Sequence, residues 1–147
     1  NVMCQLINRP NFTVTTNVKA VLENGDSCGL IITGGSYYGL KITKINGKLI
    51  AQQVSYELTR SEDKEEIVGG SMPLETDQLY LRLKVSYPNC IESYISTDNK
   101  NYVKIGNTVE YEVSRKSWVG GKIGIYCTSG NSETHKSYAK YDYINVE

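Results

Sequence analysis

Apolar and polar residues alternate with a period of two along most of this chain, and this pattern limits the fold more than any other feature of the sequence. The clearest stretch runs from Phe12 to Leu22, and similar stretches occupy 79–85 and 90–96. Turn signals such as Asn46-Gly47 separate the stretches, and none of them keeps a period of 3.6 residues. About ten strands of ordinary length joined by turns predict an all-β sandwich or barrel.

Length and charge narrow the class of protein. With 147 residues and a mass of 16.4 kDa, the chain is expected to form one domain over residues 1–147. Sixteen Lys and Arg balance sixteen Asp and Glu, which argues against a nucleic-acid-binding protein and against a polybasic membrane anchor. No apolar run is long enough for a transmembrane helix. The first residue is Asn rather than Met, which indicates a mature product or an excised domain.

The cysteines and the single histidine give no sign of a zinc or catalytic site. Cys4, Cys28, Cys90 and Cys127 are too far apart in sequence for zinc-ligand spacing. Two states stay open for them, namely buried thiols in strands or one disulfide, for example between Cys28 and Cys127. His135 lies in a polar segment that is typical of a solvated loop. No pattern of paired carboxylates for a glycosidase is found, so an enzyme is not expected.

Tyrosine dominates the aromatic residues, with twelve Tyr beside one Phe and one Trp. Tyr and Trp suit sugar recognition because their rings stack on sugar rings and lose little conformational entropy. Strand alternation predicts that several tyrosines and polar neighbours point away from the core. Trp118 has the largest ring. Each single Tyr can equally be an ordinary surface residue of a strand, and the sequence does not decide which strands share a sheet. The candidate carbohydrate-binding residues are Tyr37, Tyr80, Arg82, Glu92, Tyr94, Trp118 and Tyr126.

Seven short segments, in order along the chain, resemble landmarks of one known family. The most specific is 117–127, Ser-Trp-Val-Gly-Gly-Lys-Ile-Gly-Ile-Tyr-Cys. It is similar to a W-[IV]-G-[AG]-K-[VI]-G-[LI]-[FY]-C stretch in the C-terminal domain of glycoside hydrolase family 43 β-xylosidases and arabinofuranosidases. The other six segments are weaker one by one, and they are 5–12, 28–31, 37–40, 79–83, 94–98 and 141–144.

The resemblance implies a concanavalin-like jelly-roll β-sandwich of two antiparallel sheets that is not itself catalytic. In the family this domain follows a five-bladed propeller that holds the catalytic acids, packs against it, and is treated as a xylan-binding module. The family's domain begins some tens of residues earlier, with an Asp-Phe pair and a Trp-bearing strand. Three alternatives therefore stay open: a clipped chain, a strand supplied from elsewhere, or a shorter relative. A missing strand would leave an unpaired edge, which favours association.

No cofactor is required by this interpretation, but a structural Ca²⁺ is a further expectation from the resemblance. Many concanavalin-like sandwiches hold one with acids and carbonyls, as hard cations prefer. The candidate ligands are Glu23, Asp26 and Asp142, since the early turn and the final strand often meet. The alternative is three ordinary surface acids without an ion.

Two functions follow from these expectations. The first is a non-catalytic module that binds xylan or arabinoxylan beside a family 43 catalytic domain. The second is a structural domain that docks on that propeller and shapes its active site without binding sugar itself. A roughly linear, exposed aromatic strip would favour the first, and a broad apolar patch would favour the second. A polysaccharide substrate implies a secreted or cell-surface location, with the cytoplasm as the alternative if oligosaccharides are imported.

Overall fold

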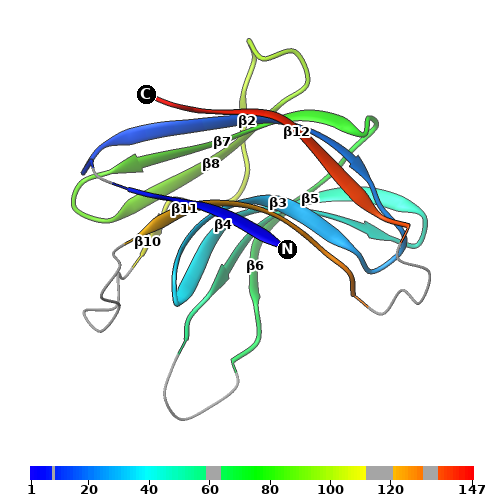
Figure 1. Ribbon diagram of the computed structural model, residues 1–147, viewed down its shortest axis with the longest axis horizontal. Coiled ribbons are helices and arrows are strands. Elements are labelled where there is room, and N and C mark those ends of the chain that lie inside the picture. Colours follow the sequence, from blue (N-terminus) through cyan, green and yellow to red (C-terminus); the bar gives the residue numbers. More distant parts are fainter. Residues whose placement is uncertain (8, 59–63, 112–120, 131–135) are drawn as a thin grey trace.

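Two antiparallel sheets pack face to face in the computed structural model, which describes residues 1–7, 9–58, 64–111, 121–130 and 136–147 (Figure 1). Sheet A has six strands in the order β1-β11-β3-β4-β5-β6. Sheet B has the order β10-β8-β7-β2-β12, with β9 paired to β8. The strands are β1 (Val2–Leu6), β2 (Phe12–Val21), β3 (Ser27–Gly34), β4 (Ser36–Ile45), β5 (Lys48–Tyr56), β6 (Ile67–Pro73), β7 (Gln78–Ser86), β8 (Cys90–Ser96), β9 (Val103–Lys104), β10 (Val109–Glu110), β11 (Lys122–Thr128) and β12 (Tyr138–Val146).

The all-β prediction is confirmed, and three strands are additional to those that the alternation indicated. β1 was missed because all five of its residues are exposed, so no apolar face distinguishes it. β10 has only two residues. β6 contains Gly69 and Gly70, where the pairing with β5 shifts register, so this glycine pair forms a bulge inside a strand. Within the described part of the chain, no helix is long and apolar enough to cross a membrane.

The core lies between the inner faces of the two sheets. Leu79, Leu81 and Leu83 of β7 are fully buried, as the alternation in that stretch predicts. They join Leu30 and Leu40 of sheet A in one hydrophobic cluster. Burial of such a continuous apolar layer is the main force that holds two sheets together, since the sheets share few backbone hydrogen bonds.

One side chain also bonds the two sheets directly. The Tyr141 hydroxyl, on the inner face of β12 in sheet B, accepts a hydrogen bond from the backbone N–H of Gly29 at 2.9 Å. The same hydroxyl lies 2.7 Å from the carbonyl oxygen of Tyr126 and 3.0 Å from that of Gly29, to which it can donate. These contacts fix the edge strand β12 of sheet B over β3 and β11 of sheet A.

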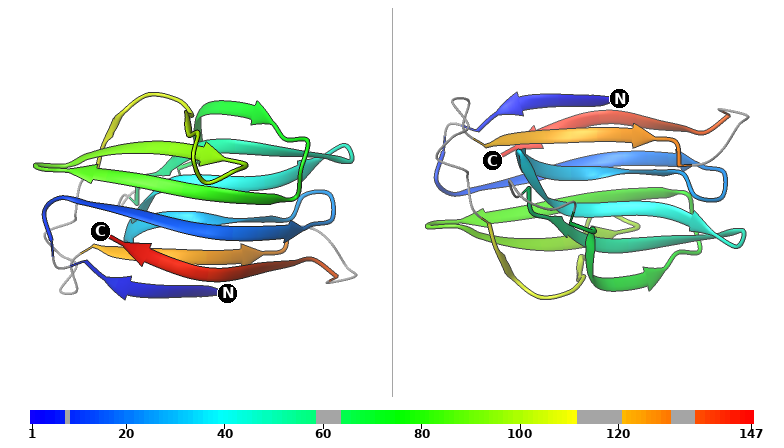
Figure 2. Two further views of the ribbon diagram at one scale, coloured as in Figure 1. Left: turned by 90° about the horizontal axis from the view of Figure 1, so that it is seen from above. Right: turned by 90° about the horizontal axis from the view of Figure 1, so that it is seen from below.

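Curvature distinguishes the two outer faces of the sandwich. Both sheets arch in the same sense, so the outer face of sheet B is convex and the outer face of sheet A is concave (Figure 1). Views from above and below show β1 lying beyond β12 at one side of the sandwich (Figure 2). No strand of sheet B among the described residues lies opposite β1, which explains why both of its faces are exposed.

Candidate functional site

The predicted carbohydrate-binding residues lie on two opposite faces of the molecule. Tyr80 and Arg82 of β7, with Glu92 and Tyr94 of β8, point outward from sheet B, as the strand alternation predicts. The remaining described candidates point outward from sheet A, and they are Tyr37 of β4 and Tyr126 of β11. Trp118 lies outside the described residues, as does His135. A single site that contains all seven candidates is therefore not formed.

Three of the four candidates on sheet B belong to what we call the arginine face, defined as Arg82 with Tyr80, Tyr94, Tyr102 and Tyr143. Arg82 and Tyr94 are register partners on neighbouring strands. Tyr80 lies two residues before Arg82 on the same side of β7. Burial raises the pKa of Tyr143, and the nearby Tyr80 and Arg82 also affect this pKa, which shows that the three side chains lie close together. The array therefore crosses the strands of sheet B on its convex side.

Arg82 is held in place by two contacts. Its Nε–H donates a hydrogen bond to the hydroxyl of Thr15 at 3.0 Å. Its guanidinium carbon lies 3.7 Å from the ring centroid of Tyr102, which is cation–π geometry. Guanidinium has five N–H donors, and the other four have no acceptor among the described residues. They are free to donate to the hydroxyl groups of a ligand.

The loop between β8 and β9 positions Tyr102 over Arg82. Asp98 accepts hydrogen bonds from the backbone N–H groups of Lys100 and Asn101, both at 2.8 Å, and from the hydroxyl of Ser96 at 2.9 Å. These bonds hold the pKa of the Asp98 carboxyl well below its usual range. They keep the loop in one conformation, so the aromatic cover of Arg82 is largely formed before any ligand arrives.

Glu92 borders the arginine face as an ionised acceptor. Lys104 Nζ lies 2.9 Å from Glu92 Oε1, and the hydrogen bond from Lys104 lowers the pKa of Glu92. The pKa of the neighbouring Tyr94 is raised by burial and by the charge of Glu92. Both groups present their polar atoms to solvent beside Arg82, where ligand hydroxyls could bond to them.

Sequence reasoning missed Tyr102 and Tyr143. The register of β12 shifts between Tyr141 and Ile144, both of which pack toward the core, so Asp142 and Tyr143 form a bulge opposite Asn17. A strict alternation cannot reveal such a bulge. Tyr102 lies on a loop, where no periodicity applies, although Asp98-Asn99 marks the turn that places it.

The two candidates on sheet A line a depression that we call the sheet A hollow. Its volume is about 360 Å³, and its lining includes Tyr37, Tyr126, Lys41, Glu66, Ile31 and Thr33. Tyr37 stacks on Tyr56 with ring centroids 5.2 Å apart. The hollow therefore combines aromatic walls with a small number of polar groups, the composition that is common in ligand sites.

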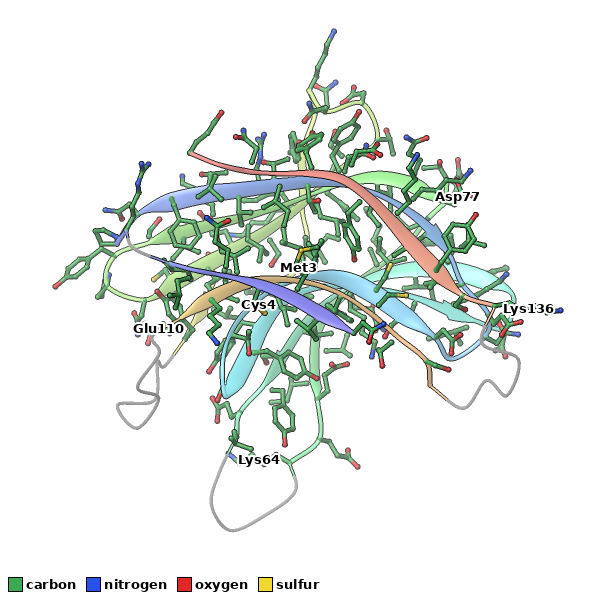
Figure 3. All side chains as sticks on the ribbon, viewed as in Figure 1. Met3, Cys4, Lys64, Asp77, Glu110 and Lys136 are labelled. Atoms are coloured by element: carbon green, nitrogen blue, oxygen red, sulfur yellow. The ribbon has the colours of Figure 1, made fainter. Side chains whose placement is uncertain are left out.

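Glu66 joins the hollow although no sequence pattern marked it as a site residue. It ends a charged run, 61–66, of which residues 61–63 lie outside the described part of the chain. Glu66, however, accepts hydrogen bonds from the Tyr37 hydroxyl and from Lys41 Nζ, the latter at 2.6 Å. Lys64 lies in the connection between β5 and β6, away from the two sheets (Figure 3). From there the chain runs to β6, and Glu66 lines one side of the hollow.

The three predicted calcium ligands do not form a metal site. Among the described residues, no group of three or more His, Cys, Asp and Glu could hold an ion. Asp26 is fully buried, and its carboxylate accepts hydrogen bonds from the Gly130 N–H at 2.8 Å and from the Ser137 hydroxyl. Asp142 lies on the exposed bulge of β12, 3.8 Å from Lys140. The expected cluster with Glu23 is not formed, because Asp142 follows the inward-facing Tyr141 and so faces outward, whereas Asp26 is buried.

All four cysteines are free thiols in the structure. Cys28 and Cys127 are register partners on β3 and β11, so the pair named for a disulfide is adjacent but reduced. Cys28 is buried, as expected for a small apolar side chain. Cys4 is exposed on β1, on the side of the strand opposite to Met3 (Figure 3), so the expectation of burial was wrong there.

Two packed antiparallel sheets in this order, with aromatic and polar groups on their outer faces, define a concanavalin-like β-sandwich rather than a propeller. The chain belongs to the beta xylosidase C-terminal concanavalin A-like domain family of glycoside hydrolase family 43 (GH43_C2), whose model matches residues 1–147. It is thus the C-terminal accessory module of such enzymes. No curated protein matches the chain by sequence.

Solved structures agree with this fold. One is a GH43 glycoside hydrolase engineered in its active site to display both endo-xylanase and exo-arabinofuranosidase activity. It is 14% identical with a TM-score of 0.88, over 99% of this chain and 30% of that one. The GH43 protein BlXynB from Bacillus licheniformis is 17% identical with a TM-score of 0.82, over 99% and 29%. A bifunctional GH43-CE protein from Bacteroides eggerthii is 19% identical with a TM-score of 0.83, over 100% and 19%. The chain thus spans less than a third of each relative.

Proposed function

We propose that the chain is a non-catalytic carbohydrate-binding module of a hemicellulose-degrading glycoside hydrolase, and that its arginine face binds xylan or arabinoxylan. The observation that carries the proposal is Arg82, fixed by Thr15 and Tyr102, with four N–H donors free of protein acceptors in the described part of the chain. Tyr80, Tyr94 and Tyr143 surround it. An open convex face with rings and hydroxyl-binding groups suits a long polymer, which cannot enter a closed pocket.

Non-catalytic action is supported by the carboxylates. Glycoside hydrolysis normally uses two acids on opposite sides of the scissile bond. Among the described residues that line the sheet A hollow, Glu66 is the one acid, and it is paired with Lys41. At the border of the arginine face, Glu92 is paired with Lys104. We place the protein outside the cell, where the polymer is found, with the cytoplasm as the alternative if oligosaccharides are imported.

Affinity electrophoresis of the 147-residue chain tests the proposal. Native gels that contain xylan, arabinoxylan, other plant glucans or no polysaccharide are compared. We expect xylan and arabinoxylan to retard the protein, and Tyr94→Ala and Arg82→Gln to abolish most of the retardation. Tyr87→Ala is the matched control, since Tyr87 is 73% exposed in the turn between β7 and β8, away from Arg82. Equal migration in every gel would refute autonomous binding.

A second candidate function, docking on a family 43 catalytic domain, is supported by β1. Val2, Met3 and Leu6 are 57–65% exposed on this strand, whose outer edge is unpaired among the described strands. Exposed apolar side chains on an edge strand mark a protein contact. Mixing with a separately produced family 43 catalytic domain in size-exclusion chromatography tests this candidate. We expect co-elution that Met3→Lys disrupts, and separate elution of the unaltered chain would contradict it.

A further inference from the structure

Two glycines flank the residue that forms the floor of the sheet A hollow. Ile31 of β3 lines the hollow, and its register partners on the two neighbouring strands are Gly124 of β11 and Gly39 of β4. A side chain at Gly39 would be strained, since its φ is +154° and a Cβ atom would lie 2.3 Å from the carbonyl oxygen of Leu30. At Gly39 the backbone conformation therefore excludes a side chain that would stand beside Ile31.

The register rows on both sides of this floor carry larger side chains. Tyr126 and Lys41 lie in one row, with Gly29 between them, and the Tyr126 ring leans over the space that a Cβ of Gly29 would occupy, at 3.1 Å. Thr33 and Tyr37 are register partners in the row on the other side. The two aromatic rings thus lie at opposite corners of the hollow, with an aliphatic floor between them.

The walls are fixed before a ligand arrives. Tyr37 is stacked on Tyr56 and donates its hydroxyl to Glu66, which in turn holds Lys41 Nζ at 2.6 Å. Burial and then the hydrogen bond to Glu66 raise the pKa of Tyr37, so this donor stays protonated at neutral pH. Because Tyr37, Glu66 and Lys41 already hold one another by hydrogen bonds, their side chains lose little conformational entropy when a ligand binds.

The charges and the size of the hollow select one class of ligand. Lys41 and Glu66 cancel each other's charge, so the hollow does not favour a cation or an anion. The Lys41 ammonium donates and the Glu66 carboxylate accepts, and the Tyr126 hydroxyl can do both. The Thr33 hydroxyl donates to the carbonyl oxygen of Ser36 at 3.2 Å and can accept from a ligand. This set of donors and acceptors matches a ring that carries several hydroxyl groups. The volume of the hollow is about 360 Å³. This equals roughly a dozen water molecules. That is enough for one sugar ring but not for a run of several.

The geometry points to the sheet A hollow as a second carbohydrate site, which takes a single neutral sugar unit such as the end or a side branch of a chain. The apolar faces of the ring would lie on Ile31 and against Tyr126, and Lys41, Glu66 and Thr33 would bind its hydroxyls. This site is separate from the arginine face, which lies on the opposite side of the sandwich. It does not depend on the binding of polymer proposed above.

NMR titration of the 147-residue chain with D-xylose and with L-arabinose tests this inference. The backbone amides of Gly39 and Gly124 report on the floor of the hollow, and we expect saturable shifts there. Loss of the aromatic wall in Tyr126→Ala should weaken the affinity about tenfold. Glu66→Gln, which keeps the shape of the side chain, should weaken it about threefold, the effect of roughly half a hydrogen bond to a charged group. Tyr87→Ala, in the exposed turn between β7 and β8, lies outside both sites and is the control that should leave the affinity unchanged.

Several results would overturn the inference. These are the absence of saturable shifts at the glycine amides, equal shifts with glycerol, or unchanged affinity in both hollow variants. If Tyr126→Ala alters the spectrum of the free protein, Glu66→Gln decides. Titration with xylohexaose separates the two proposals, because the amides of Ile95 and Lys104 report on the arginine face. Shifts there without pentose shifts in the hollow would leave the proposed function standing and refute the second site. Pentose binding in the hollow without retardation in the xylan gels would refute the proposed function and leave the second site standing.

Discussion

The two buried serines of β8 differ in what their hydroxyl groups contact. Ser93 is 0% exposed on the core side, and its Oγ has no hydrogen-bond partner among the described residues. Ser96, which is 4% exposed, donates to Asp98 and accepts from the backbone N–H groups of Asp98 and Asn99. A buried hydroxyl without a partner destabilises the folded state, whereas a bonded one stabilises it.

Replacing these serines by alanine should therefore have opposite effects. We expect Ser93→Ala to raise the free energy of unfolding by about 1 kcal/mol, since an unsatisfied polar group leaves the core. Ser96→Ala should lower it by about 1 kcal/mol and loosen the loop that holds Tyr102. Urea unfolding followed by tryptophan fluorescence measures both. Equal destabilisation by the two substitutions would mean that the Ser93 hydroxyl has a partner in solution.

At the scale of elements, the hairpin between β4 and β5 shows how a short motif sets the register of a sheet. Asn46 and Gly47 have positive φ values of 50° and 79°. This is the pattern of a two-residue type I′ turn. Ile45 and Lys48 are consequently register partners, and the pairing continues to Tyr37 and Tyr56. That register stacks the two tyrosine rings beside the sheet A hollow.

Substitution of Gly47 tests the strength of this motif. A Cβ atom at Gly47 would meet no atom within 4 Å, so Gly47→Ala changes only the backbone preference. We expect a loss of about 1–2 kcal/mol in the free energy of unfolding, the cost of left-handed backbone for a residue with a Cβ atom. Lys48→Ala, in the strand that follows, is the control. A Gly47→Ala variant as stable as this control would show that the turn can change type freely.

Local patterns predicted most strands, because a short segment already contains both the alternation that marks a buried face and the residues that favour a turn. The alternation in β7 and the Asn46-Gly47 turn both predicted the observed structure. The strands that were missed, such as β1, do not bury an apolar face. Alternation also predicted correctly that Arg82 and Tyr37 point outward, since the direction of a side chain depends only on its own strand.

The composition of each candidate site could not be predicted in the same way. Which strands share a sheet depends on pairings between distant segments, and these separated Tyr80 from Tyr126. Glu66 reaches Tyr37 across 29 positions of sequence. The bulge that exposes Tyr143 depends on how β12 pairs with β2. Contacts of this kind decide a site, and no short pattern contains them.

At the scale of the whole molecule, the space between the sheets holds ionisable groups that must stay neutral. Cys28 is fully buried on the inner face of β3. Burial, and to a lesser extent the neighbouring Cys127, raises the pKa of Cys28 from 9.0 to about 12, although a hydrogen bond with Tyr141 partly opposes the shift. Burial also raises the pKa of Tyr141, whose hydroxyl joins the two sheets. Deprotonation of either group would place an anion in the core.

The stability of the sandwich should therefore fall in alkaline solution. An unfolded chain loses the Cys28 proton near pH 9, whereas the folded chain keeps it until about pH 12. Stability is consequently at its full value below pH 9 and declines as the pH rises toward 12, by as much as about 4 kcal/mol from this thiol. Urea unfolding at a series of pH values, with a reducing agent present, measures the decline. Cys28→Ala should have a shallower slope, with the remainder contributed by Tyr126 and Tyr141, two half-buried tyrosines whose pKa values are raised by burial. Parallel slopes for the two proteins would show that the Cys28 thiol ionises equally in the folded and unfolded states.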